Sequence, residues 1–292
     1  MRKSMEDRLF PIFNYTVLSL IGLVTLFPLY YVVVVSFMDP SEYLQGGMRL
    51  FPTTWSLASY KYLLSTKAFV NATMVSGFLA IVGTFCSLVI TAALAYALSR
   101  RRMPARRAML LMILLTTLFN PGMIPPYLLV RDLHLINSIW SLIIPVLTSG
   151  WYVILMKGFF DSIPDSLEEA AQIDGCNDIG IWFKVILPLS LPSMAAFGLF
   201  YAVGYWNTFF SAVLYISDSS KWPLQVLLQN MLIDSSTAAG GGAAQEMMNE
   251  RAIPPETLKM AAVVIATVPI LFVYPFLQKH FAKGVMVGSI KG

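Results

Sequence analysis

The stretch Glu169-Ala170-Ala171-Gln172-Ile173-Asp174-Gly175, followed after nine further residues by Val185-Ile186-Leu187-Pro188, governs how this chain is organised. It is polar, it lies between two long apolar runs, and it has the form of a helix-turn-helix. Alanine favours helices, glycine is the usual residue just beyond a last helical turn, and Leu187-Pro188 stand where the next apolar run begins. The pattern predicts a structured polar loop inside a membrane protein.

The composition of the chain indicates a polytopic membrane protein. Of its 292 residues, 57% are hydrophobic and only 12% are charged, and the mean hydropathy is +0.68; a soluble domain carries about 25% charged residues. A spanning helix needs roughly 20 apolar residues, and uninterrupted apolar runs suit helices rather than the alternating strands of a barrel. We therefore expect an all-α membrane protein in which residues 1–292 form one domain of six transmembrane helices. The expected spans are Phe13–Met38, Val70–Ser99, Ala108–Val130, Ser138–Met156, Val185–Val213 and Leu258–Leu277.

The distribution of Lys and Arg orients the chain in the membrane. The net charge of +4 and the pI near 9.0 would suit a nucleic-acid partner, but with the N-terminus inside, 13 of the 20 basic residues fall on inner segments, against the remaining seven. Such an excess marks the cytoplasmic side. The bias predicts cytoplasmic termini and no bound nucleic acid. The first span is too long for a signal peptide and lacks a small-residue cleavage site, so we expect it to be an anchor.

The outer segment 214–257 contains a predicted helix and a flexible stretch. Five apolar residues behind Trp222-Pro223 recur at helical spacing: Leu224, Leu227, Leu228, Met231 and Leu232. This periodicity predicts an amphipathic helix that lies on the membrane or against a partner, or one that simply covers the outer ends of neighbouring spans. The run Gly240-Gly241-Gly242-Ala243-Ala244 favours a flexible connection.

The cytoplasmic segment 158–184 has the features of a rigid lever. Pro164 suits a first helical turn, and the acidic side chains of Asp165, Glu168 and Glu169 suit the positive end of a helix dipole. Gly175 is expected to end this helix with a positive φ. Asn177 is expected to cap a second short helix that leads into the fifth span.

This loop resembles the cytoplasmic coupling loop in permease subunits of binding-protein-dependent ABC importers. Their pattern is Glu-Ala-Ala, three residues, Gly, nine residues, Ile, any residue and Leu-Pro, from which only Val185 departs. Further segments are similar to the carbohydrate branch of these permeases, which includes the smaller maltose permease, and most closely to the LplC-like and alginate oligosaccharide group. These segments are Ala95-Tyr96-Ala97-Leu98-Ser99-Arg100, Trp206-Asn207, Pro223-Leu224-Gln225, Tyr274-Pro275-Phe276-Leu277-Gln278-Lys279 and the run from Gly284 to Gly292.

The resemblance implies a permease of the type I ABC importer architecture in a bacterial cell (inner) membrane, with residues 158–184 as its coupling loop. The positions implied in coupling to an ATPase are Glu168, Glu169, Ala170, Ala171, Asp174, Gly175, Leu187 and Pro188. The implied partners are a second homologous permease, two ATPase subunits, an extracytoplasmic solute-binding protein, membrane lipid and an oligosaccharide that could contain uronate units. ATP and Mg would belong to the ATPase subunits, so neither a cofactor nor enzymatic activity is expected of this chain.

Four residues of the fifth span are candidates for the substrate path. Tyr201, Tyr205, Trp206 and Asn207 are uncharged groups that could meet a sugar ring and its hydroxyls. Aromatic side chains in membrane proteins also serve packing and interface anchoring, and this second interpretation stays open. An acidic sugar would call for cations, and Arg131, Lys221 and Arg251 are present only in outer loops.

The sequence also carries no sign of catalysis and leaves two other functions to consider. It has no glycine-rich phosphate loop, and His134 and His280 are too few and too far apart for a catalytic metal set. An ion-gradient-driven secondary transporter is the main alternative, but it usually needs an ionisable residue within the membrane, and the six expected spans contain no Asp or Glu. A purely structural membrane subunit is the third possibility.

Overall fold

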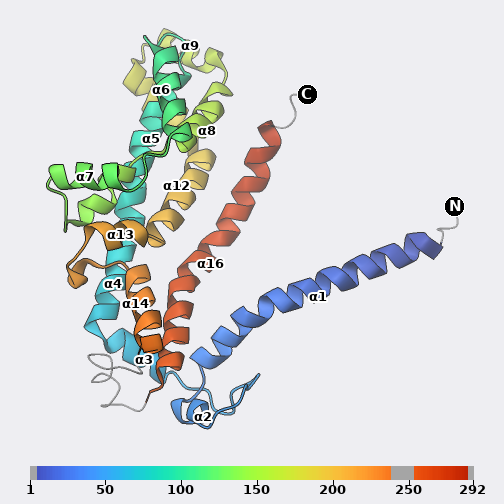
Figure 1. Cartoon of the computed structure of the whole chain (residues 1–292). Coiled ribbons are helices and arrows are strands. Elements are labelled where there is room, and N and C mark those ends of the chain that lie inside the picture. Colours follow the sequence, from blue (N-terminus) through green and yellow to red (C-terminus); the bar gives the residue numbers. More distant parts are fainter. Residues whose placement is uncertain (1–4, 238–252, 289–292) are drawn as a thin grey trace. The chain divides into compact units, whose positions relative to one another are not determined.

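A computed structural model describes residues 5–237 and 253–288. The chain divides into two compact units, one formed by residues 1–70 and 228–268 and the other by residues 71–227 and 269–292. The described residues are helical and form no strand beyond a single bridge between Met38 and Trp55 (Figure 1). The chain is therefore all-α throughout its described part.

The described helices that lie in the first unit, or continue from it into the second, range in length from 5 to 34 residues. They are α1 (Met5–Ser36), α2 (Pro40–Leu44), α3 (Ala58–Ser65), α4 (Lys67–Phe78), α14 (Leu224–Thr237) and α16 (Pro255–Gly288). The remaining second-unit helices are α5 (Thr84–Ser99), α6 (Arg106–Leu118), α7 (Ile124–Asp132), α8 (Gly150–Asp161), α9 (Asp165–Ile173), α10 (Asp178–Ile181), α11 (Leu187–Leu189), α12 (Leu191–Trp206) and α13 (Phe210–Tyr215). Short π-helical turns, η1 (Leu79–Gly83) and η4 (Trp182–Ile186), and 3-10 turns, η2 (Ile139–Leu142), η3 (Ile144–Val146) and η5 (Ser219–Lys221), join them.

Three described helical segments are long and apolar enough to cross a membrane by themselves. These are Phe10–Ser36, Lys67–Ser99 and Pro255–Val273, which overlap with the first, second and sixth expected spans. Two bent helix pairs also qualify when each pair is counted as one span, which makes up to five among the described residues. The expected count of six is thus not reproduced by helix length and composition alone.

The expected third span does not form one continuous helix. Between Ala108 and Val130, helix α6 ends at Leu118 and α7 begins at Ile124. Pro121 disfavours a helical residue before it, and Gly122 has a φ of +75°, which breaks the helical path. With 13 residues, α6 is about 20 Å long, short of the roughly 30 Å hydrocarbon core.

The fourth and fifth expected spans are bent for similar reasons. The fourth contains Pro145 within η3 and turns by 51° between residues 139–146 and α8. The fifth turns by 79° where α11 meets α12. Pro192 lacks the N–H that would continue the helical ladder and its ring crowds the carbonyl four residues earlier, so the helix restarts at Leu191. It ends at Trp206 rather than at Val213.

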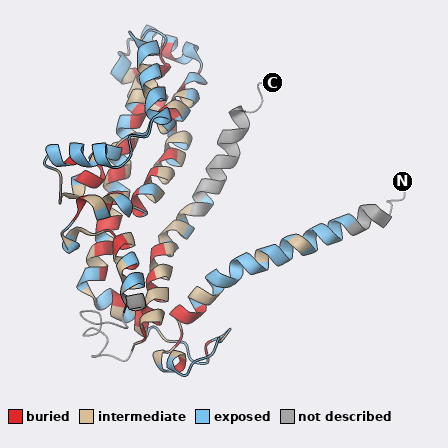
Figure 2. Cartoon of the chain, viewed as in Figure 1, coloured by how far each residue is buried: buried red, intermediate tan, exposed pale blue. Residues whose placement is uncertain are grey.

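The second unit is built around α5, which packs on α8 and α12. Small side chains on α5, including the fully buried Ala92 and Ala95, let neighbouring helices approach closely, as is common in membrane bundles. At the end of α5 nearest α9 they join a cluster with Leu98, Met156 and Phe160. Figure 2 shows buried residues along α5 and α12, in contrast to the largely exposed α1. The unit therefore offers a firm base for the polar loop.

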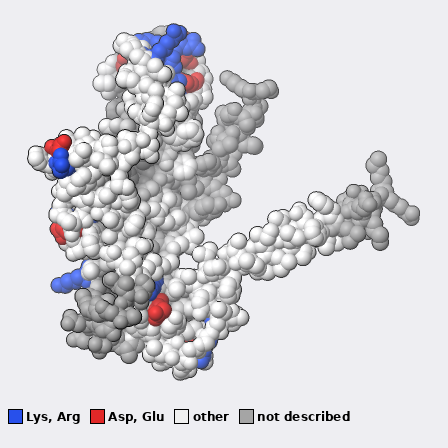
Figure 3. Space-filling model, viewed as in Figure 1, with Lys and Arg blue, Asp and Glu red and all other residues white. Residues whose placement is uncertain are grey.

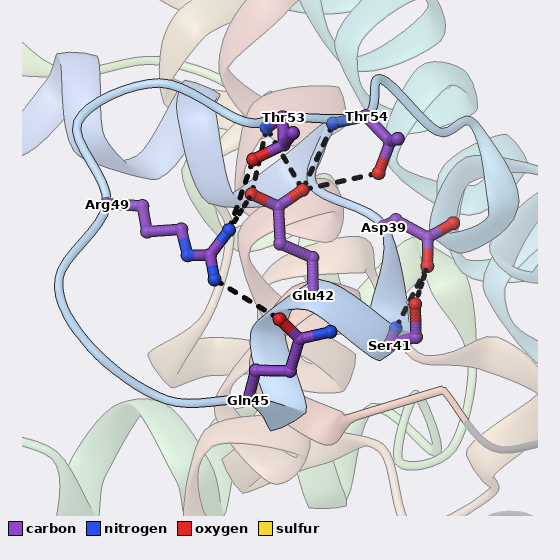
Figure 4. A network of polar contacts seen from close by, with 7 residues as sticks. All are labelled: Asp39, Ser41, Glu42, Gln45, Arg49, Thr53 and Thr54. Carbon is purple, nitrogen blue, oxygen red and sulfur yellow. Dashed lines mark hydrogen bonds and ion pairs between the residues drawn. The ribbon is translucent and has the colours of Figure 1, made fainter.

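In the first unit, a buried carboxylate holds the segment after α1. Glu42 of α2 accepts hydrogen bonds from the backbone N–H groups of Thr53 (2.8 Å) and Thr54 (3.1 Å) and pairs with Arg49 at 2.9 Å (Figure 4). The Thr53 N–H is the main cause that lowers the pKa of Glu42 to about 2. This network closes residues 42–54 into a compact loop.

The predicted helix behind Trp222-Pro223 is confirmed as α14. Leu224 is fully buried, and its N–H donates to Ser76 Oγ at 2.9 Å. This contact favours the interpretation in which the helix covers neighbouring parts of the chain. The stretch Gly240-Gly241-Gly242-Ala243-Ala244 lies outside the described residues.

Candidate functional site

The polar loop 158–184 contains, after the last residues of α8, the helix that the acidic residues predict. Helix α9 starts at Asp165, and Asp165 and Glu168 lie in its first turn, where the helix dipole favours negative charge. Pro164 precedes the helix by one residue instead of lying in its first turn. Its missing N–H costs nothing there, because the first N–H groups of a helix have no partner within the helix.

Gly175 ends α9 in the predicted manner. Its φ is +82°, a left-handed conformation that glycine adopts without steric cost. The N–H of Gly175 donates to the Gln172 carbonyl at 3.0 Å, and that of Cys176 donates to the Ala171 carbonyl at 2.9 Å. These two bonds form a Schellman motif, so the turn has a defined geometry.

The second helix of the loop is also capped as predicted. The Asn177 side chain accepts a hydrogen bond from the Gly180 N–H at 2.8 Å at the start of α10. From α10 the chain continues through η4 and α11, where Leu187 is half-buried and Pro188 is exposed. The bend into α12 follows directly, so Leu187 and Pro188 lie at the junction between the loop and the fifth span.

The candidate coupling residues divide into an outer and an inner group. Glu169, Ala170, Asp174 and Gly175 are exposed, whereas Glu168 and Ala171 are buried. Of these six residues of α9 and its turn, only the first group is accessible to another protein.

Exposed apolar side chains lie on the same loop, and sequence reasoning missed them. Ile173 is 86% exposed and Ile179 is 67% exposed, and Leu167 and Phe183 are also exposed. Large exposed apolar groups beside exposed charges are typical of protein interaction sites. A signal was present in the sequence, because bulky apolar residues interrupt an otherwise polar helix.

Basic side chains gather next to this loop. Figure 3 shows Lys and Arg side chains over the turn between α5 and α6, with acidic side chains beside them. Arg101, Arg102 and Arg107 are exposed there, and Arg102 forms an ion pair with Asp178 of α10. This end of the second unit is strongly charged although the chain as a whole is apolar.

Glu168 is held inside the unit by Arg100. Arg100 follows the last residue of α5, and its Nη1 lies 2.7 Å from Glu168 Oε1. Both residues are buried, with exposed fractions of 8% and 7%. The Tyr96 hydroxyl donates to the same Glu168 oxygen at 3.2 Å. Glu168 therefore contacts the end of α5, which belongs to the second span.

Two of the four substrate-path candidates on α12 contact side chains of α5. The Tyr201 hydroxyl lies 2.6 Å from Thr91 Oγ1, and the Tyr205 hydroxyl lies 2.8 Å from Ser87 Oγ. Both tyrosines are buried. Tyr201 also meets the ring of Tyr152, with centroids 4.7 Å apart. The packing interpretation, which the sequence left open, is the one that this geometry supports for Tyr201 and Tyr205.

Asn207 remains accessible at the end of α12. It is exposed, its Nδ2 donates to the Val203 carbonyl at 2.9 Å, and its Oδ1 accepts from Gln225 Nε2 at 3.1 Å. Trp206 beside it is buried at 9% exposure. Thus only Asn207 of the four presents an open polar group, and it does so together with Gln225.

The described residues contain no group of three or more His, Cys, Asp or Glu that could hold a metal ion. Cys86 and Cys176 are free thiols.

Comparison with known proteins assigns this geometry to a transport family. The family of binding-protein-dependent transport system inner membrane components matches residues 88–287. The chain is 46% identical to the polygalacturonan/rhamnogalacturonan transport system permease protein YtcP of Bacillus subtilis, over 99% of this chain and 100% of the relative. It is 44% identical to protein LplC of the same organism, over 100% and 98% of the two chains.

A solved structure agrees with these relatives. It is a chain in the crystal structure of a bacterial ABC transporter involved in the import of the acidic polysaccharide alginate. The TM-score is 0.88 and the identity 32%, with 96% of this chain and 99% of that chain covered.

Proposed function

The chain belongs to the family of binding-protein-dependent transport system inner membrane components, and from this premise we propose how it takes part in import. It is a permease component of a carbohydrate ABC importer in the inner membrane. The proposed task of residues 158–184 is to transmit the ATP-driven movement of partner subunits to the spans. The observation that carries this proposal is the rigid, capped α9–α10 pair with exposed Glu169, Ala170 and Ile173.

The exposed side of this pair suits a groove in a soluble ATPase. Ala170 lets a partner approach closely, Ile173 offers apolar area, and Glu169 and Asp174 offer charges for pairing. Gly175 sets the angle between the two helices through its turn. The ATP and Mg of the reaction belong to the ATPase subunits, and this chain contributes a mechanical part.

The proposed assembly contains two permeases, two ATPase subunits and an extracytoplasmic solute-binding protein. Family membership supports a binding protein and an ATPase as partners. A second, homologous permease would complete the pathway for the sugar. The secondary transporter predicted as an alternative lacks support, because this family works with separate ATPase subunits.

We propose six membrane crossings with both termini in the cytoplasm. The two bent pairs would each cross once, and α6 with α7 would form the remaining crossing despite the break at Pro121. Irregular backbone is tolerated at membrane depth where protein surrounds it. The excess of Lys and Arg on the inner segments supports this orientation.

The proposed substrate is a uronate-containing oligosaccharide. One similar protein is a permease of a polygalacturonan/rhamnogalacturonan transport system, and another belongs to a transporter involved in the import of the acidic polysaccharide alginate. The outer cations considered for such a sugar are already engaged where they are described: Arg131 pairs with Asp132 at 3.0 Å, and Lys221 donates to the Asn137 carbonyl at 2.8 Å. Arg251 lies outside the described residues. Selection for acidic groups is therefore assigned mainly to the binding protein.

Affinity purification of the tagged chain from its native host, followed by mass spectrometry, tests the assembly. Recovery of an ATPase, a second permease and a binding protein is the expected result. Recovery of the chain alone, with uptake in liposomes that follows an ion gradient, would overturn the proposal in favour of a secondary transporter. A reporter fused after Gly292 tests the topology, and it should respond as a cytoplasmic domain.

A further inference from the structure

The Arg100 side chain, which directly follows α5, contacts residues of both α8 and α9. Arg100 Nη1 meets Glu168 Oε1 at 2.7 Å, Nη2 donates to the Phe160 carbonyl at 3.1 Å, and Nε donates to Ser99 Oγ at 2.9 Å. Its guanidinium also lies 4.9 Å from the ring centroid of Tyr96. Arg100 therefore joins α5, the end of α8 and the first turn of α9.

The burial of this ion pair limits what Glu168 can do. A buried carboxylate and a buried guanidinium are costly to remove from water and are kept only with good geometry and further hydrogen bonds. Here the Tyr96 hydroxyl and the Phe160 carbonyl supply these bonds. The Glu168 carboxylate already has hydrogen-bond partners inside the chain and is buried, so it is not available to pair with a charge on an ATPase.

We propose that Arg100 and Glu168 form the joint through which α9 moves the second span, and that Glu168 is a positioning residue rather than an ATPase contact. This inference rests on the proposed function. A helix that docks on a moving partner transmits motion only if it is fixed to the spans. The pair fixes the first turn of α9 to the end of α5.

A second set of contacts continues the connection away from the loop. Along α5, Thr91 and Ser87 bond the hydroxyls of Tyr201 and Tyr205 on α12. Displacement of α5 is thereby passed to α12, whose far end carries Asn207. The joint thus leads from the loop to the helix that holds the open substrate-path candidate.

Asp165 provides a matched control within the same turn. Its Oδ1 lies 3.7 Å from the same Arg100 Nη1, too far for a hydrogen bond, and its side chain is 74% exposed. Asp165→Asn and Glu168→Gln each remove one negative charge beside one cation. They differ in whether the charge is removed from a buried pair or from an exposed side chain.

The decisive experiment measures sugar transported per ATP hydrolysed by the complete importer in proteoliposomes. For Glu168→Gln we expect about a tenfold fall in this ratio, because the amide can still accept from Arg100 but lacks the charge that strengthens the bond by about that factor. ATP hydrolysis and ATPase recruitment should be retained. Asp165→Asn should change the ratio by no more than about twofold, as exposed ion pairs contribute little.

The double variant Arg100→Gln/Glu168→Gln guards against misfolding, because it leaves no unpaired buried charge. It should assemble and show the same low ratio as Glu168→Gln. If either variant transports as much sugar per ATP hydrolysed as the wild type, the proposal that this pair is the joint is wrong. The proposal is also wrong if both variants fail to assemble with the partner subunits while Asp165→Asn assembles, because the pair would then be needed only for folding. If the wild-type chain recruits no ATPase, the proposed function itself fails, which is a separate result.

Discussion

The ring of Tyr205 lies directly against the backbone of Gly83. A Cβ atom on Gly83 would come within 2.7 Å of Cζ of Tyr205, closer than carbon atoms approach without displacement. Gly83 ends the π-helical turn η1 in the second span, and Tyr205 lies in the last turns of α12. The two helices therefore cross at a point where only glycine fits.

Substitution Gly83→Ala should destabilise the chain and disturb transport. The added methyl group must displace a buried ring, and such overpacking costs about 1 to 3 kcal/mol. Thermal unfolding of the purified protein in detergent measures this effect. Gly77→Ala is the matched control in the adjoining helix, because nothing lies within 4 Å of a Cβ there. Equal stability of the two variants would mean that the contact does not exist.

Tyr201→Phe and Tyr205→Phe should affect stability more than substrate use. Each removes a hydroxyl that bonds a buried side chain of α5, at a cost of about 1 kcal/mol. A lower unfolding temperature with an unchanged KM for sugar uptake is expected. If either tyrosine contacts the sugar instead, KM will rise while the unfolding temperature stays the same.

Local features of the coupling loop could be predicted from sequence because neighbouring residues encode them. Gly175 and Asn177 act on backbone groups within five residues of themselves. Helix α14 follows from its apolar spacing for the same reason. The prolines at 121 and 192 were visible too, but whether a proline bends or breaks a membrane helix depends on packing around it.

The roles of Glu168 and Tyr201 could not be predicted in this way. Glu168 meets Arg100, 68 residues earlier, and Tyr201 meets Thr91, 110 residues earlier. Periodicity cannot reveal which buried group lies opposite another after folding. The sequence therefore predicted the two capped helices of the loop but did not separate its buried carboxylate, Glu168, from its exposed one, Glu169.

A graded series at Gly175 tests the geometry of the turn. Since φ is +82° and no atom lies within 4 Å of an added Cβ, backbone strain alone should set the effect. Asn tolerates this conformation, and other residues lose about 1 to 2 kcal/mol. ATPase recruitment should therefore decrease in the order Gly, Asn, Ala, Val. Gly158→Ala, in α8 with open space around it, should leave recruitment unchanged, and an irregular order would disprove the argument.

The carboxylate of Glu42 should make the stability of the first unit depend on pH. Its pKa is about 2 in the folded chain, compared with an ordinary 4.5, chiefly because of the Thr53 N–H. A lowered pKa means that the carboxylate stabilises the folded state fully above pH 4.5 and loses this contribution as the pH falls toward 2. The difference in unfolding temperature between wild type and Glu42→Gln should thus be constant near neutrality and shrink below pH 4.5. A difference that does not vary with pH would show that the network stabilises the loop without the charge.

Asn207 and Gln225 should respond to sugar rather than to folding. The two amides bond each other at 3.1 Å, and Asn207 is exposed, so each keeps hydrogen-bonding capacity that a sugar hydroxyl could use. Asn207→Ala should lower substrate-stimulated ATP hydrolysis about three- to tenfold, the effect of one lost hydrogen bond, and leave the basal rate nearly unchanged. Gln225→Ala should show the same separation, whereas Gln229→Ala, an exposed glutamine four residues further along α14, should not. If basal and stimulated rates fall together in the first two variants, the amide pair only joins α12 to the start of α14, and the sugar passes elsewhere.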